Sequence, residues 1–225
     1  ETTWTMLDEK LDLTLGLRYF YDDAFNAEVL DPATLALIQS EDPNYTGMVN
    51  QTFDSTNPRL NLFYSVNDDW IVYGNVAKGF RTGQTQPAIT LGFAALFGVQ
   101  VPSGIKPETM WSYETGTKGT FMDGRAQLEA AVFYNDWQDL QVLVVVQPPV
   151  RGLINGGDAR TQGIELGLTL LPIEGLQLKF AGSYTDAEFT EAVSGINISA
   201  GDKIPNVPET LFSAAVTYRW PFVKS

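Results

Sequence analysis

The stretch that most constrains the fold is "LDLTLGLRYFYDD", residues 11–23. Every odd position from Leu11 to Tyr21 is leucine or tyrosine, and the even positions are mostly polar or glycine. Alternation with a period of two predicts a β-strand that has one apolar face and one polar face. A half-buried strand needs only about five or six residues. This strand is longer, so its apolar face requires an unusually extended apolar environment.

The same alternation recurs along the chain. It appears in "RLNLFYSV" (59–66), "GIELGLTL" (163–170), "GLQLKFAGSY" (175–184) and "TLFSAAVTYRW" (210–220). Helical periodicity is nearly absent, so the sequence predicts an all-β chain.

The connections between these segments are of two kinds, and they alternate. Short turns rich in Asp, Asn and Gly occur at 7–10, 67–69, 122–124 and 172–175, and long irregular stretches occur at about 23–56, 84–106, 143–158 and 189–206. One rim of the sheet should therefore carry tight turns and the other long loops. The pattern predicts an antiparallel up-and-down meander of about nine strands, centred near residues 4, 16, 61, 76, 114, 132, 165, 181 and 213.

Long alternating strands with loops sorted by length are typical of an outer-membrane β-barrel, in which the leucines face lipid and the polar residues face the interior. Aromatic residues near the predicted strand ends fit the two membrane interfaces. No segment approaches the roughly 20 apolar residues of a membrane helix. The alternative is a secreted β-sandwich, in which the leucines would face a second sheet. Sandwich strands are shorter, however, and their turns are not sorted by length.

The first strand should run towards the short-turn rim, which would place Glu1 at the outer rim. Intact bacterial barrels have an even number of strands, so about nine strands indicate part of a larger barrel, which we expect to have 22 strands. A small passive channel or structural barrel of about eight to ten strands that closes by itself is the alternative.

Composition excludes several functions. A net charge of −13 argues against a nucleic-acid partner. The absence of cysteine and histidine excludes disulfides, Ser-His or Cys-His catalysis and the common zinc sites within this chain. The adjacent carboxylates Asp22-Asp23 and Asp68-Asp69 would point to opposite faces of a strand. We therefore expect neither an enzyme nor a bound cofactor or metal.

Several segments resemble the TonB-dependent outer-membrane receptors. They are "LDLTLGLRYFYDD", "NPRLNLFYSVNDDWIVYGNVAKGFRTG", "KPETMWSYETGTKG" with Pro107, Glu108, Tyr113, Glu114, Gly116 and Lys118, "FYNDWQDLQV", "NGGDARTQGIELGL" and "GDKIPNVPETLFSAAVTYRW". Each segment alone is weak evidence for the family, but the order of the segments along residues 2–220 is similar to their order in the family.

The resemblance implies a location in the bacterial outer membrane and active uptake of a scarce nutrient, such as a metal chelate, cobalamin or a glycan. The implied partners are the receptor's own plug domain, TonB, membrane lipid and lipopolysaccharide. Residues 1–225 are expected to form a single partial barrel domain, without the plug, the TonB box or the final strand.

Polar residues on the inward face of the strands are candidates for contact with the plug or the substrate. They are Arg18, Arg59, Asn61, Asn75, Arg81, Glu114, Lys118, Gln127, Glu129, Glu165, Gln177 and Lys179. Avoidance of lipid alone would also place them there, because a cation at the membrane midplane costs about 2–4 kcal/mol.

The long loops add further candidates. Residues 19–58 contain seven acidic residues and no lysine or arginine, which suggests either a solvated loop or one that binds lipopolysaccharide through divalent cations. In "DPATLALIQ", Asp31 and Pro32 predict the start of a short helix. The apolar segment 88–101 offers Phe93 and Phe97 as ligand contacts, or forms a helix resting on neighbouring loops. Residues 155–158 predict a turn back into the barrel, with Asn155 and Asp158 as candidate loop contacts.

Overall fold

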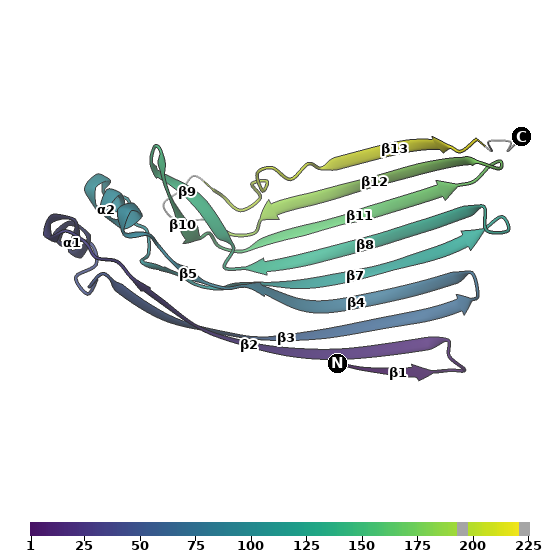
Figure 1. Ribbon diagram of the computed structural model, residues 1–225, viewed down its shortest axis with the longest axis horizontal. Helices are drawn as coiled ribbons and strands as arrows, with labels where there is room; N and C mark the ends of the chain where they lie inside the picture. Colours follow the sequence, from purple (N-terminus) through teal and green to yellow (C-terminus); the bar gives the residue numbers. More distant parts are fainter. Residues whose placement is uncertain (193–197, 221–225) are drawn as a thin grey trace, which may run out of the picture.

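The computed structural model describes residues 1–192 and 198–220. Over these residues, nine strands form one antiparallel sheet in which each strand pairs with the next along the chain (Figure 1). The strands are β1 (Thr2–Met6), β2 (Leu11–Ala27), β3 (Met48–Asn67), β4 (Trp70–Arg81), β7 (Glu108–Phe121), β8 (Ala126–Gln138), β11 (Ala159–Leu170), β12 (Leu176–Phe189) and β13 (Thr210–Tyr218). Each spans or closely flanks a predicted centre, so the predicted meander is confirmed.

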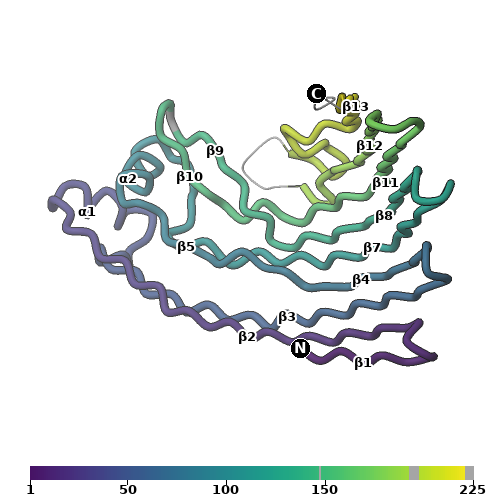
Figure 2. The backbone as a smooth tube through the Cα atoms, turned by 45° about the vertical axis from the view of Figure 1, so that its right-hand side comes forward, coloured from purple at the N-terminus to yellow at the C-terminus, as the bar shows by residue number. Residues whose placement is uncertain are grey.

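The sheet is curved and open (Figure 2). In the described part of the chain, β1 and β13 form its two edges and do not pair with each other. The remaining described strands form only two-stranded ribbons at the loop end, so no second large sheet covers the apolar face and the sandwich alternative is wrong. These nine strands also do not close into a small barrel by themselves.

The two rims differ as the sequence predicts. The four tight turns lie together at one end of the sheet, and the long connections lie at the other (Figure 1). In the first of these turns, Leu7, Asp8 and Glu9 all have positive φ angles, of 56°, 53° and 65°.

Two boundaries differ from the prediction. The segment predicted as irregular between residues 23 and 56 is strand at both of its ends, because β2 continues to Ala27 and β3 begins at Met48. Cross-strand bonds such as that from Thr52 Oγ1 to Asp23 Oδ1, at 2.8 Å, extend this hairpin beyond the apolar alternation. Strand β1 is short, and Thr2 pairs with Leu15. Glu1 therefore lies partway along β2 and not at the outer rim.

The loop end carries two helices and two ribbons. They are α1 (Pro32–Gln39), α2 (Ala88–Phe97), β5 (Gln84–Thr85) with β6 (Gly104–Ile105), and β9 (Gln141–Gln147) with β10 (Val150–Asn155). The predicted helix start is confirmed, since the Asp31 carboxylate accepts bonds from the backbone N–H groups of Ala33 and Thr34, each at 3.0 Å. A further bond from the Thr34 hydroxyl is the main reason that the pKa of Asp31 is lowered. Across the described residues, neither helix is long and apolar enough to cross a membrane.

The apolar face of the sheet is exposed to its surroundings. Leu17 and Val216 are each 71% exposed and Leu166 is 53% exposed. Near the loop end of this face, the rings of Trp111, Tyr113 and Tyr134 follow one another at centroid separations of 6.3 Å. An aliphatic surface bordered by aromatic rings is the lipid-facing surface of a membrane barrel.

Aromatic rings also lie over glycines of neighbouring strands. A Cβ atom added at Gly163 would approach the Tyr184 carbonyl oxygen to 2.1 Å and the Phe133 ring to 2.8 Å. At Gly116 a Cβ would lie 2.6 Å from the Tyr73 hydroxyl oxygen. These glycines are therefore required by close packing and not by their backbone angles.

We predict that Gly163→Ala destabilises the barrel by about 1–3 kcal/mol, because the added methyl group overpacks against a backbone oxygen. The free energy of unfolding of the refolded full-length protein measures this effect. Gly167→Ala is the matched control on the same strand, since its Cβ would meet its nearest neighbour, Glu129 Cβ, at an ordinary 3.7 Å. Equal effects of the two substitutions would contradict the packing argument.

We predict that Leu166→Arg destabilises the barrel in a lipid bilayer by about 2–4 kcal/mol, because the guanidinium would enter hydrocarbon. Ser183→Arg places the same side chain on the opposite face and should cost much less. Folding measurements in vesicles compare the two variants. A larger cost for the Ser183 variant would reverse the assignment of the faces.

Candidate functional site

The pairing register brings the polar candidates onto one face of the sheet. Paired residues of antiparallel strands point to the same side, and Asn61 pairs with Asn75, which pairs with Glu114. Four residues beyond Glu114 on β7, Lys118 pairs with Glu129. Pairing and alternation place all twelve polar candidates on the face opposite Leu166: Arg18, Arg59, Asn61, Asn75, Arg81, Glu114, Lys118, Gln127, Glu129, Glu165, Gln177 and Lys179.

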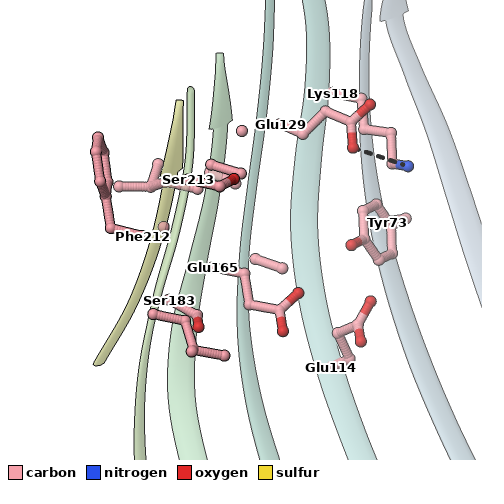
Figure 3. Close-up of a pocket in the computed structure, with 15 residues that line it drawn as sticks. Tyr73, Glu114, Lys118, Glu129, Glu165, Ser183, Phe212 and Ser213 are labelled. Carbon is pink, nitrogen blue, oxygen red and sulfur yellow. Dashed lines mark ion pairs between the residues drawn. The ribbon is translucent and has the colours of Figure 1, made fainter. Parts of the chain in front are cut away.

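The middle of this face is a concave, acidic pocket of about 710 Å³ (Figure 3). Its polar lining residues are Tyr73, Glu114, Lys118, Glu129, Glu165, Ser183 and Ser213, contributed by β4, β7, β8, β11, β12 and β13. The Lys118 ammonium lies 3.5 Å from a Glu129 carboxylate oxygen, and both side chains are at least half exposed. This ion pair is therefore weak.

Two carboxylates in the pocket are not balanced by a cation. Among the described residues, neither Glu114 nor Glu165 forms an ion pair. Within the described part of the chain, Lys118 is the one cation that lines this pocket, and it pairs with Glu129. The centre of the polar face therefore attracts cationic groups.

The part of this face nearer the loops is more basic. Arg59 Nε donates to Asn61 Oδ1 at 3.3 Å, and Arg18 lies on the neighbouring strand. Arg81 Nη2 donates to Glu108 Oε2 at 2.6 Å, and its side chain remains 55% exposed. The remaining candidates, Gln127, Gln177 and Lys179, lie nearer the short turns.

The aromatic candidates lie on α2, outside the acidic pocket. The Phe93 and Phe97 rings stack at a centroid separation of 6.2 Å, and Phe97 is 50% exposed. Residues 88–97 of the 88–101 segment form the helix of the second predicted arrangement, and ligand contact by Phe93 and Phe97 stays a prediction. This helix packs on the neighbouring loop, where Leu91 and Ala88 join Ile38 in one cluster.

Asn155 ends β10, and residues 156–158 connect it to β11, so this segment returns the chain to the sheet as predicted. The Asn155 side-chain amide donates to the carbonyl oxygens of Lys106 and Asp139, each at 3.0 Å. Asp158 Oδ1 accepts from the backbone N–H of Asp139 at 3.1 Å. Both candidate side chains are thus engaged by the chain's own backbone.

Sequence reasoning missed several buried polar residues that organise the loop end. Glu108, which is 6% exposed, accepts a bond from the Gln141 backbone N–H as well as from Arg81. Gln86, Gln141 and Glu28 also bridge separate loops. Glu108 was visible as part of the Pro-Glu block, whereas the two glutamines and Glu28 have no distinguishing local pattern.

Comparisons with known proteins agree with this geometry. A family model described as "TonB dependent receptor-like, beta-barrel" matches residues 1–223. The pesticin receptor of Yersinia pestis is 27% identical over 216 residues, which are 92% of this chain and 28% of that receptor. The metal-pseudopaline receptor CntO of Pseudomonas aeruginosa is 28% identical over 160 residues, which are 71% of this chain and 20% of that receptor.

Solved structures share the fold. The ferric yersiniabactin uptake receptor FyuA from Yersinia pestis superposes with a TM-score of 0.69 at 22% identity, over 95% of this chain and 29% of that one. The siderophore receptor PiuA from Acinetobacter baumannii gives a TM-score of 0.63 at 22% identity, over 93% and 29% of the two chains. This chain therefore spans less than a third of the length of these relatives.

The relatives are named as receptors and not as enzymes, and proteins of this family reside in the bacterial outer membrane. The match over nearly the whole chain, together with the curved sheet and its two distinct faces, shows that the chain belongs to the β-barrel family of TonB-dependent receptors.

Proposed function

We propose that this chain forms part of the barrel wall of a receptor that takes up a siderophore or another metal chelate across the outer membrane. The observation that carries the proposal is the concave polar face with its unbalanced carboxylates, set opposite a face suited to lipid. Relatives named for metal-pseudopaline and ferric yersiniabactin support a metal chelate over cobalamin or a glycan.

The unpaired edges of the sheet indicate that it is part of a larger barrel. Within a bilayer, an unpaired strand edge leaves backbone N–H and C=O groups without partners, at a cost of several kcal/mol for each group. β1 and β13 are such edges in the described part of the chain. We infer that further strands of the full-length receptor pair with them and close the barrel.

The acidic pocket provides a contact surface for the plug domain. Two unbalanced carboxylates facing a barrel interior are stabilised by cationic side chains, since charge-assisted hydrogen bonds are among the stronger polar contacts. We infer that Glu114 and Glu165 accept such bonds from the receptor's own plug, on which coupling to TonB would act.

The acidic segment of residues 19–58 has a partly structural role. Asp31 caps α1, Asp23 accepts a bond from Thr52, and Glu28 accepts from the first turn of α2. Contact with lipopolysaccharide remains a proposal for other exposed acidic residues, such as Asp54.

Deletion of the gene encoding the full-length receptor tests the substrate class. We expect accumulation of at least one radiolabelled ferric chelate to fall in cells lacking the receptor and to recover on complementation. Uptake of cobalamin and of oligosaccharides should be unchanged. Loss of cobalamin or glycan uptake with normal chelate uptake would contradict the proposal.

The double substitution Glu114→Gln and Glu165→Gln tests the pocket. Loss of charge-assisted bonds, each worth about 1.5–3 kcal/mol, should weaken the plug contact and lower chelate uptake severalfold at unchanged receptor abundance. The control is Glu9→Gln with Glu174→Gln, which makes the same change of charge in two short turns. Equal uptake by the two double variants would show that the pocket carboxylates have no such role.

A further inference from the structure

The loop between β4 and β7, residues 82–107, lies between two other loops at the outer end of the sheet. It carries α2 and the β5–β6 ribbon. Figures 1 and 2 show α1 on one side of α2 and the β9–β10 ribbon on the other. On both sides, polar side chains cross from one loop to another, and on the α1 side they add to the apolar cluster of Ile38, Ala88 and Leu91.

On the first side, Glu28 caps a helix that belongs to a different loop. Its two carboxylate oxygens accept from the Ala88 backbone N–H at 3.1 and 3.0 Å. The α2 N-cap residue, Pro87, provides no side-chain acceptor of its own. Glu28 is in turn held by its backbone bond to the Gly47 carbonyl, at 2.8 Å, and by Asn26, whose amide also donates to Thr85 Oγ1 at 3.1 Å.

On the second side, Gln86 bridges to the β9–β10 ribbon. Its buried carboxamide donates to the Leu153 carbonyl oxygen and accepts from the Leu153 backbone N–H, the second bond being 3.3 Å. Thr90 Oγ1, which also belongs to the β4–β7 loop, donates to the Arg151 carbonyl oxygen at 3.2 Å.

The base of the same ribbon is fixed by two further side chains. Gln141 Nε2 donates to the carbonyl oxygens of Thr82 and Lys106, at 3.0 and 3.1 Å. Asn155 Oδ1 accepts from the Lys106 backbone N–H at 2.9 Å.

We propose that the β2–β3, β4–β7 and β8–β11 loops form a single rigid extracellular unit, in which Glu28 and Gln86 are the two positioning residues. Gln86, Thr90 and Gln141 are 3%, 3% and 8% exposed. Separating the β4–β7 loop from the β8–β11 loop breaks the bonds of these three buried side chains, and separating it from the β2–β3 loop removes the Glu28 acceptor from the first turn of α2. Loss of the partner of a buried polar group is costlier than loss of a solvated bond. The three loops therefore open together and do not act as independent lids. This inference does not depend on which nutrient is transported.

Amide hydrogen exchange in the purified full-length receptor tests the coupling without any ligand. We expect Glu28→Ala to speed exchange about tenfold in α2 and also in the β9–β10 ribbon, which Glu28 does not touch. Glu41→Ala is the matched control. It removes an exposed carboxylate from the same loop, and Glu41 makes no side-chain bond among the described residues.

Faster exchange confined to residues 28–47 and the first turn of α2 would overturn the proposal, because the loops would then be independent. If Glu28→Ala does not assemble, Gln86→Ala tests the same coupling from the other side. Its effect should reach residues 28–47 as well as the β9–β10 ribbon. An effect limited to the neighbours of residues 86 and 153 would equally overturn the proposal.

Discussion

The structure depends on one constraint, which is that no backbone polar group is left unpaired in hydrocarbon. An antiparallel sheet meets this demand for every strand except its edges, and it leaves the two faces free to differ. In this chain the two faces differ strongly in composition. Leucine, valine and tyrosine cover one face, and the charged residues at the middle of the sheet, such as Glu114 and Glu165, lie on the other. Charged residues on the apolar face, such as Lys78 and Asp136, lie near its loop end. The lipid-facing surface, the polar interior and the need for further strands beyond β1 and β13 all follow from this arrangement.

The polar face is not uniform along its length. Arginines on β2, β3 and β4 lie towards the loops, and Glu114, Glu129 and Glu165 lie at the centre. Glycines such as Gly116 and Gly163 leave room on this face for the rings of Tyr73 and Phe133. The wall is therefore closely packed within itself, yet the charge of its central carboxylates is left for another part of the receptor to balance.

Most of the sheet was predictable because its signals are local. Alternation identified the strands, turn residues identified the tight rim, and the Asp31-Pro32 pair identified the start of α1. The loop end was predictable only in part. The extension of the β2–β3 hairpin lacks apolar alternation, and Glu28, Gln86 and Gln141 act on residues that are distant in sequence. A glutamate that caps its own helix has a recognisable spacing, whereas one that caps a helix 60 positions away has none.

The central claim is that adjacent residues of one strand face lipid and the barrel interior in turn. Since the chain contains no cysteine, single cysteines introduced at positions 164–169 of the full-length receptor carry spin labels at known sites. Their collision rates with oxygen and with a polar nickel chelate, measured in bilayers, test the claim directly. We predict high oxygen access at Ile164, Leu166 and Leu168 and low oxygen access at the positions between them. Collision rates without a period of two, or with the opposite phase, would contradict the account.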